Sequence, residues 1–587
     1  MLEWAIRGAT PHAPLSPLDP QLPMRSSAPL LRAALGASLL SVAASAQVLH
    51  VDANLTTGAN DGSSWADAFQ GLTGVQQALA VAASGDQVWV ADGLYRPTDT
   101  TQRGVSIFLL SGVELYGSFQ GGEGSLAERP PLGDFPSVLS GDLLGDDAGP
   151  GTFLDNSFHV VNAQGADATA VLDGFTVTAG NANGGGSLQD RGGGLLCSGA
   201  HSPTIRNCRF VANRCSFGGA AGYINNGGEP SFTDCSFEDG VGGSFGGAFD
   251  IASGGSVRFD RCLFVGNTAQ RAGALEVFNT TGVFVTNCLF FNNTATGSGG
   301  GGAIWMGSGG NTRVRNCTIV GNSSLAQAQG GIRDQGSANE TVANCIVWGN
   351  SGPGGAMAAL NQINNGVTVL HCIVEGGYPG TGNLGVDPQL VDQAGGDLNL
   401  SASSPAIDAG LNNGVPNGIV LDFAQNPRFV DDPNVVDTGS GTAPIVDIGA
   451  YERPSGPFSR VSGCFGNTGV LSGGSVFQLG QPLDFQLDTS VVLNGLGVFL
   501  TGVDGTDASG CGVVIPGTGE FLLGFVPHSV LLGTAPLAAG VSSFGLPLPN
   551  DPTLAGKTLA FQAAGADLVS PGFPVETSDM LIGTIAP

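Results

Sequence analysis

Ile205-Arg206-Asn207-Cys208-Arg209-Phe210-Val211-Ala212-Asn213 is one copy of a pattern that recurs at 259–267 (Phe-Asp-Arg-Cys-Leu-Phe-Val-Gly-Asn) and at 314–322 (Val-Arg-Asn-Cys-Thr-Ile-Val-Gly-Asn). Its cysteine occurs seven times, with spacings of 27, 27, 26, 29, 28 and 27 residues, at positions 208, 235, 262, 288, 317, 345 and 372. A step of small residues, such as Gly218-Gly219-Ala220, follows most of these cysteines after about a dozen residues.

A fixed period of this length, with short alternating strands and Gly or Asn turns, is typical of a solenoid. Two alternating apolar strands per period, without helical periodicity, favour a parallel β-helix over a leucine-rich repeat. Inward side chains of successive rungs then stack about 4.8 Å apart, so the cysteines should form an interior ladder of small apolar groups. The Asn before each cysteine suits a bend with left-handed backbone, and the Gly-Gly-Ala step suits a sharp corner.

The cysteines could instead form disulfides or a metal site. Seven equivalent positions is an odd number, and the chain has no C-x-x-C pair. A stack of reduced core thiols is therefore favoured. Cys464 and Cys511, outside the repeat, are the candidate disulfide pair.

Composition limits the function classes. The 587 residues are enough for two or three domains, and 97 glycines without a three-residue period exclude collagen. A net charge of −28 disfavours nucleic acid as a partner. Lys557 is the only lysine, which disfavours any mechanism that needs a lysine as a base, as a Schiff-base former or as a phosphate ligand.

Residues 1–46 are predicted to be a signal peptide with an over-extended start. Met24 is the expected initiator, because a basic segment with Arg25 and Arg32 precedes an apolar run over 33–43 and Ala44-Ser45-Ala46. Cleavage after Ala46 would leave Gln47 first, a boundary that N-terminal sequencing would identify. No later apolar run reaches membrane-spanning length, so we expect an exported protein, extracellular or at the cell surface, without a transmembrane helix.

The Gly-Gly-Ala and Phe-x-x-Asn elements resemble the repeats of chlamydial polymorphic outer-membrane proteins. More broadly, the region resembles the right-handed β-helix of the pectin-lyase superfamily. Residues 86–95 and 112–117 resemble its first two strands. The resemblance covers about 48–453 and implies an all-β fold: a right-handed, single-stranded parallel β-helix.

The expected domains follow from this resemblance and from changes in sequence texture. Residues 47–85 should form an N-terminal cap whose amphipathic helix carries Trp65, Phe69, Leu72, Val75 and Leu79. The β-helix is expected over 86–400 and a small C-terminal β-sandwich over 461–587. Four motifs resemble the closing module of secreted bacterial β-helix proteins, and the module is expected over 401–455. They are Asp387-Pro388, just before this range, 404–410 (Ser-Pro-Ala-Ile-Asp-Ala-Gly), 426–428 (Asn-Pro-Arg) and 447–452 (Asp-Ile-Gly-Ala-Tyr-Glu).

A candidate glycan site lies two residues beyond the small-residue step, where side chains should point outward. The predicted column is Leu196, Gly222, Asp250, Glu276, Trp305 and Asp334. Asp250 and Glu276 on neighbouring rungs would match the carboxyl separation of retaining glycosidases, about 5–5.5 Å. Trp305 could stack on a sugar ring, with Asp334 beside it. The alternative is that an exposed face of an acidic protein contains acids by chance.

Two Asp-rich loops are calcium candidates, because hard oxygen ligands in Gly-rich loops suit this ion outside the cell. One contains Asp142, Asp146 and Asp147; the other is the segment Asp422–Asp437, with Asp431 and Asp432. Solvated turn acids are the alternative, and no EF-hand spacing is present. His371 occupies a bend position otherwise taken by Asn, which predicts a structural role.

Two functions remain. The first is an adhesin-like, non-enzymatic secreted or surface scaffold that binds an extracellular polysaccharide or a surface protein. The second is a polysaccharide lyase or glycoside hydrolase, supported by the resemblance and by the Asp250/Glu276/Trp305 column. The first is favoured, because no basic residue pairs with an acid cluster in the sequence and fold alone is a weak warrant for activity.

Overall fold

The computed structural model describes residues 46–453, except 148–151, 308, 310, 337–338, 354–357, 365 and 433–434; after residue 457 the description covers the backbone of strands. Residues 1–45 lie outside it, and so does the predicted signal peptide apart from Ala46. None of the described helices is long and apolar enough to cross a membrane.

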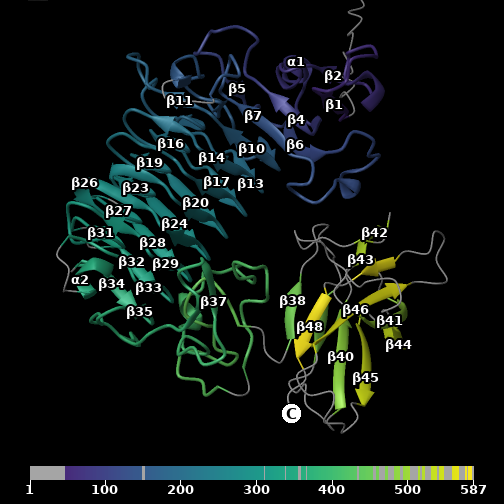
Figure 1. The fold of residues 1–587 in the computed structure, drawn as a ribbon, viewed down its shortest axis with the longest axis vertical. Helices are drawn as coiled ribbons and strands as arrows, with labels where there is room; N and C mark the ends of the chain where they lie inside the picture. The colour runs from purple at the N-terminus through teal and green to yellow at the C-terminus, as the bar shows by residue number, and fades with distance from the viewer. Residues whose placement is uncertain are drawn as a thin grey trace, which may run out of the picture. The chain divides into compact units, whose positions relative to one another are not determined.

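Each turn of the repeat visits three parallel sheets in the same order (Figure 1). Sheet A contains β2 (Phe69–Gln70), β1 (Val48–Asp52), β3 (Gln87–Ala91), β6 (Glu114–Phe119), β9 (Val171–Asp173), β13 (Thr204–Arg206), β17 (Ser231–Thr233), β20 (Ser256–Asp260), β24 (Gly282–Thr286), β28 (Thr312–Arg315), β32 (Thr341–Ala343) and β34 (Thr368–Leu370). Sheet B contains β4 (Gly93–Tyr95), β7 (Ser137–Ser140), β10 (Phe175–Thr178), β14 (Arg209–Val211), β18 (Ser236–Glu238), β21 (Leu263–Val265), β25 (Leu289–Phe291), β29 (Thr318–Val320), β33 (Ile346–Trp348) and β35 (Ile373–Val374).

Sheet C closes each turn. It contains β5 (Ile107–Phe108), β8 (Val161–Asn162), β12 (Leu195–Ser198), β16 (Gly222–Asn225), β19 (Phe249–Ala252), β23 (Leu275–Phe278), β27 (Ile304–Met306) and β31 (Ile332–Asp334). Short strands pair between sheets B and C: β11 (Asn181–Ala182) with β15 (Arg214–Cys215), and β22 (Thr268–Arg271) with β26 (Thr294–Gly300) and β30 (Ser323–Ser324). The chain is therefore a parallel β-helix whose rungs stack strand on strand.

The predicted cysteine ladder is confirmed. All seven ladder thiols are free and buried, and each of four successive cysteines donates its backbone N–H to the next Sγ at 3.3–3.4 Å, beginning with Cys262 and Cys288. The residue before each ladder cysteine has a φ of 48–54°, the left-handed bend expected for Asn. His371 also adopts it, with its ring nitrogen 3.3 Å from the Ala409 carbonyl.

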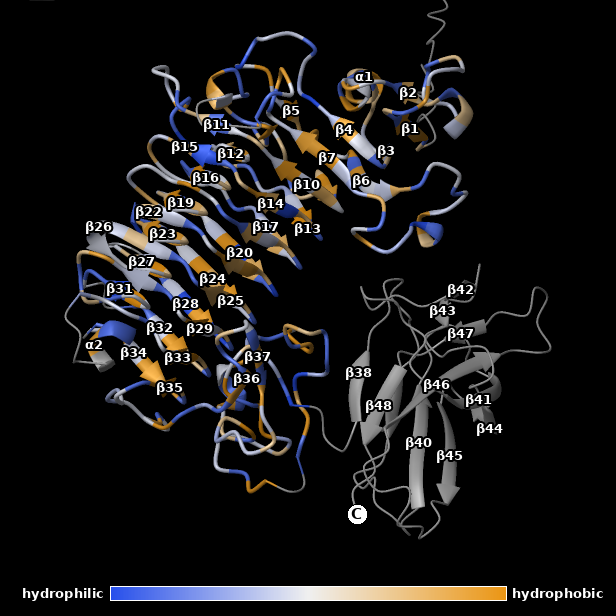
Figure 2. Ribbon diagram, in the orientation of Figure 1, coloured by the Kyte–Doolittle hydropathy of each residue, from blue (hydrophilic) through white to orange (hydrophobic). Residues whose placement is uncertain are grey.

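A second ladder runs inside the next bend. The Asn267 amide donates to Asn293, Asn293 to Asn322 and Asn322 to Asn350, each at 2.9 Å. Gln362, on the short helix α2 (Ala358–Gln362), accepts from Asn350 at 2.7 Å and ends the stack. Each amide in this row therefore has a partner. Figure 2 shows the hydrophobic colour of β-helix strands such as β33 and β35.

The N-terminal cap differs from the expectation of one amphipathic helix. Trp65 lies in a single 3₁₀ turn, η1 (Trp65–Asp67), and Phe69 lies in β2. The helix α1 spans only Gly74–Val81, because Gly71 takes a φ of 73° that interrupts it. Val75 and Leu79 are buried as predicted, whereas Leu72 is exposed. Two further 3₁₀ turns lie in loops, η2 (Leu126–Glu128) and η3 (Thr152–Leu154).

The closing module begins before residue 401. The last parallel strand is β35, and β36 (Leu390–Asp392) pairs antiparallel with β37 (Asp397–Leu400), so these residues belong to the closing module rather than to the β-helix. The 3₁₀ turn η4 (Asn412–Gly414) follows. Apolar side chains of the module pack on the outer face of sheet B, joining Leu289, Val320, Ile346 and Ile373 to Leu398, Ile407 and Ile448.

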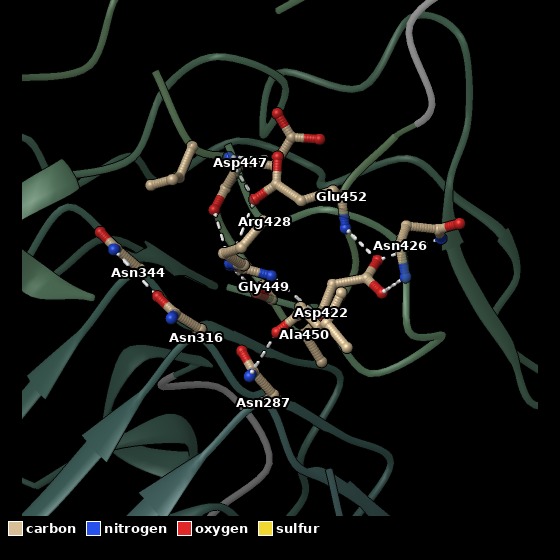
Figure 3. A network of polar contacts seen from close by, with 12 residues as sticks. Asn287, Asn316, Asn344, Asp422, Asn426, Arg428, Asp447, Gly449, Ala450 and Glu452 are labelled. Carbon is tan, nitrogen blue, oxygen red and sulfur yellow. Dashed lines mark hydrogen bonds and ion pairs between the residues drawn. The ribbon is translucent and has the colours of Figure 1, made fainter. Parts of the chain in front are cut away.

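Two of the closing motifs, 426–428 and 447–452, meet in one buried polar network (Figure 3). Arg428 is fully buried; its Nε lies 3.1 Å from Glu452, and Nη2 donates to the Gly449 carbonyl at 2.7 Å. The Ala450 N–H donates to Thr318 on sheet B, and Gly449 N–H donates to the Asn344 carbonyl at the bend. The motifs thus fasten the module to the β-helix.

The described strands of the C-terminal region pair antiparallel, in agreement with the predicted all-β domain. Its main sheet contains β38 (Phe458–Val461), β48 (Met580–Thr584), β46 (Thr558–Ala566), β41 (Asn494–Gly502), β44 (Val530–Ala538), β45 (Val541–Pro547), β40 (Pro482–Asp488) and β39 (Val470–Gly473), with β47 (Val575–Thr577) paired to β46. β42 (Val513–Ile515) and β43 (Gly519–Phe521) form a hairpin. Cys464 and Cys511, the candidate disulfide pair, lie outside the described residues.

Candidate functional site

The predicted acid column lies on the outer side of sheet C, but its register differs at two positions. Backbone pairing aligns Leu196, Tyr223, Asp250, Glu276, Trp305 and Arg333. Tyr223 replaces Gly222, and Arg333 replaces Asp334. Asp334 pairs with Met306, which is completely buried, so Asp334 lies in the inward row and its placement beside Trp305 is wrong.

The column is also covered rather than accessible. Asp250, Glu276 and Trp305 are only 2–3% exposed. The covering side chains are the residues that immediately precede the small-residue step of successive rungs: Arg191, Phe217, Phe245 and Arg271. The prediction of an open acid and aromatic patch is therefore wrong, because a second layer of side chains lies over sheet C.

In this layer, two phenylalanines lie between two arginines. The Arg191 guanidinium lies 4.1 Å from the Phe217 ring, Phe217 packs edge-on against Phe245 at 4.8 Å, and Arg271 lies 4.2 Å from Phe245. Arg271 also stacks on Trp305 at 4.0 Å and forms an ion pair with Glu276. The guanidinium thus occupies a face of Trp305 that a sugar ring would need.

The two acids have different surroundings. Arg271 Nε donates to Glu276 at 3.1 Å, whereas no described residue donates a hydrogen bond to the Asp250 carboxyl group. Burial and then the charge of Glu276 raise the pKa of Asp250 to about 8, and burial raises the pKa of Glu276 to about 7 despite Arg271. Burial therefore favours the protonated form of Asp250, whereas the ion pair with Arg271 favours the charged form of Glu276.

This arrangement predicts how stability depends on pH. Both folded-state pKa values are raised, so the acids contribute most stability below about pH 4 and lose it as pH rises to about 8. Asp250→Asn keeps the shape without the charge; we expect it to come closest to the parent near pH 4 and to be more stable by a few kcal/mol at pH 8, at about 1.4 kcal/mol per pKa unit. Urea unfolding at both values measures this.

An exposed acid provides the control for that experiment. Asp99→Asn removes the same charge from a loop and should leave the pH slope unchanged. An Asp250→Asn protein that keeps the full slope would show that the buried pair does not govern stability.

An open groove lies elsewhere, along the bend between sheets A and B. Its volume is about 470 Å³, and its floor crosses four rungs at Thr176, Arg209, Ser236 and Leu263. Leu132 and Pro136, from the connection between β6 and β7, form one wall, and Phe423 of the closing module forms the other. Four stacked rungs give the floor a length of about 15 Å.

The covered and open parts of sheet B differ in outward residues. The outward row of the groove floor continues as Leu289, Thr318, Ile346 and Ile373, and the closing module covers this mainly apolar part. The polar start of the same row stays open. The closing module therefore covers sheet B only as far as its outward residues are apolar. The uncovered part is a recessed surface with both polar and apolar side chains.

The groove carries paired rather than free charges. Arg209 makes a two-pronged ion pair with Glu238, at 2.9 and 2.6 Å, and Arg261 makes one with Asp234, at 2.7 and 2.9 Å. Half of the Arg209 side chain is exposed, whereas Arg261 is mostly buried. Such planar pairs present hydrogen-bond donors and acceptors side by side, and each pair carries no net charge.

The first calcium candidate is rearranged in the structure. Carboxylate oxygens of Asp142, Asp146 and Asp155 lie within 4.8 Å of one another. Asp147 instead accepts from the Asn156 amide at 2.8 Å, and Asp142 accepts from the Gly145 N–H at 2.5 Å. The sequence analysis did not include Asp155, which the fold brings close to Asp142 and Asp146. Calcium binding here stays a prediction.

The comparisons with known proteins agree with the fold. Residues 144–298 and 274–386 match a family model described as "Right handed beta helix region". Neither curated proteins nor solved structures gave a match to this chain. Together with the parallel sheets, the match confirms the predicted right-handed parallel β-helix.

Proposed function

We propose that this chain is an exported, adhesin-like β-helix scaffold that binds a neutral polysaccharide in the sheet B groove without transforming it. The open groove carries the proposal, because it is a recessed surface across several rungs. The leader-like N-terminal segment and the resemblance to secreted β-helix proteins support export to the medium or the cell surface.

The chemistry of the groove favours a neutral sugar chain. Hydroxyl groups both donate and accept, so they suit the Arg209–Glu238 and Arg261–Asp234 pairs. Leu263 and Phe423 offer apolar surface to ring faces. A polyanion would meet paired arginines on a protein with a net charge of −28, which disfavours it.

Arg209→Ala should weaken glycan binding by about tenfold to a hundredfold, the scale of hydrogen bonds to a charged group. A glycan array would identify the ligand, and calorimetry would measure the affinity of both proteins. Arg258→Ala is the matched control: Arg258 is exposed on the outer face of sheet A, away from the groove lining, where it stacks on Phe284 at 4.6 Å. Equal affinity in the Arg209 variant and the parent would contradict the groove assignment.

The second candidate function is a polysaccharide lyase or glycosidase. The acid pair Asp250 and Glu276, with pKa values near neutrality, favours it, and the Arg/Phe cover over the pair disfavours it. Reducing-sugar and unsaturated-product assays on the array ligand separate the two functions. Turnover that Asp250→Asn and Glu276→Gln abolish would establish the enzyme.

A further inference from the structure

Three acids of the closing module meet at one point. Carboxylate oxygens of Asp408, Asp431 and Asp437 lie within 4.8 Å of one another. Asp431 and Asp437 are exposed, whereas Asp408 is completely buried. Oxygen ligands around Ca²⁺ lie 2.3–2.6 Å from the ion, so oxygens this close can all touch one ion.

The buried acid lacks a partner on one side. Asp408 Oδ2 accepts from the Asp432 N–H at 3.2 Å, but no described residue donates to Oδ1. A buried carboxylate oxygen without a donor is costly unless a cation neutralises it. Burial, together with the charges of Asp431 and Asp437, also raises the pKa of Asp408 to about 6.

The neighbouring arginine is already occupied. Arg453 forms its ion pair with Asp432, and its backbone N–H donates to Asp447 at 2.7 Å. Asp432, one of the acids that the sequence suggested for calcium, is thus held by Arg453. The cluster of three carboxylates is arranged differently from this ion pair. The exposed acids Asp431 and Asp437 approach the buried Asp408, which lies more than twenty residues earlier in the chain.

We propose that Asp408, Asp431 and Asp437 bind a calcium ion that fastens Asp431 and residues 437–439 to the closing network. Oxygen-only donors and an open outer side suit Ca²⁺ better than Mg²⁺, which requires near-ideal octahedral geometry. Asp408 is well placed to transmit the effect, since its N–H donates to Asp447 at 2.8 Å and its carbonyl accepts from Thr438 and Gly439 at 3.0 Å.

The test is thermal unfolding of the full chain after treatment with a chelator, followed by titration with Ca²⁺ or, separately, Mg²⁺. A ligand that binds only the folded state raises the midpoint, and 1 mM Ca²⁺ should raise it by about 2–4 °C. Mg²⁺ at the same concentration should raise it by much less. No rise with Ca²⁺ in the parent protein would overturn the proposal.

Variants assign the effect to this cluster. Asp437→Asn changes an exposed ligand, so it should fold normally and lose the calcium response. Asp99→Asn removes the same charge at a remote exposed loop and should keep the response. Asp146→Asn removes a ligand of the other candidate cluster, so the calcium response that this variant keeps is the one assigned to Asp437. A calcium response retained in Asp437→Asn, or lost in Asp146→Asn, would overturn the assignment. Circular dichroism confirms that each variant is folded.

Discussion

Arg428→Met is expected to destabilise the closing module by about 3–5 kcal/mol, the usual loss when one partner of a buried ion pair is removed. Arg428 is fully buried and donates to the Asp447, Gly449 and Ala450 carbonyls at 3.1, 2.7 and 3.2 Å. Methionine fills similar volume but donates nothing, so the Asp447 and Gly449 carbonyls lose this donor, and the Ala450 carbonyl keeps the Phe423 N–H. Glu452 also loses its cation, and burial already holds its pKa well above the usual value.

The readout is limited proteolysis with mass mapping, alongside urea unfolding. Cleavage should appear within 401–453 under conditions that leave the parent intact, while the rungs around 205–320 persist. The double variant Arg428→Met/Glu452→Gln removes the stranded acid and should recover part of the loss. If the single variant resists protease like the parent, Arg428 does not hold the module on sheet B.

The repeat made the β-helix predictable from sequence. The cysteine period set the rung length, and Asn207 and its equivalents marked bends that do adopt positive φ. Both features reflect a local requirement. A left-handed bend favours Asn at one position, and the tightly packed interior favours a small side chain such as Cys at the next. Sequence reasoning therefore succeeded where one position has one physical requirement.

The predicted strand register of sheet C was wrong in two rungs, where the small-residue step differs from Gly-Gly-Ala followed directly by the strand. Gly218-Gly219-Ala220 is followed by a second alanine, so counting from the first glycine stops one residue early, at Gly222 instead of Tyr223. In Gly330-Gly331-Ile332, the isoleucine pairs with Ile304 and so occupies the first strand position, not that of the alanine. A one-residue shift turns a side chain to the opposite face, which moved Asp334 inward.

The cover over sheet C could not be predicted, because no strand pattern specifies which loop side chains lie over a face. The sequence did contain a signal: Arg191, Phe217, Phe245 and Arg271 each precede a step of small residues. Likewise, the outward residues of sheet B change from Arg209 and Ser236 to Leu289 and Ile346. That change marks where the closing module begins to cover the sheet, and hence where the groove lies.

The closing motifs and the groove are linked by this packing. Phe423 forms a groove wall and packs edge-on against Tyr451 at 5.4 Å, and its N–H donates to the Ala450 carbonyl that Arg428 also binds. The polar network therefore fixes the position of that wall. Motifs that look purely architectural in the sequence set the dimensions of the proposed binding surface.

Cys262→Asp should be the most damaging single change to the β-helix itself. Cys262 is completely buried, its N–H donates to the Cys288 Sγ at 3.4 Å, and its own Sγ faces the Phe232 carbonyl at 3.6 Å. A carboxyl group there would stay protonated and poorly hydrogen-bonded, at a cost of about 4–8 kcal/mol. Cys262→Ala keeps a small apolar side chain and should cost far less.

Because each rung contacts only its neighbours, damage at one rung should separate the turns before it from the turns after it. Thiol labelling measures this: in a Cys464→Ser/Cys511→Ser background, the remaining cysteines report on the β-helix, and the described ones are buried and free in the folded protein. Labelling should be slow in the parent and in Cys262→Ala but fast in Cys262→Asp, reaching Cys235 and Cys288 first. Equal rates in the Asp and Ala variants would mean that the ladder position tolerates a carboxyl group, and the ladder would not be the core of the solenoid.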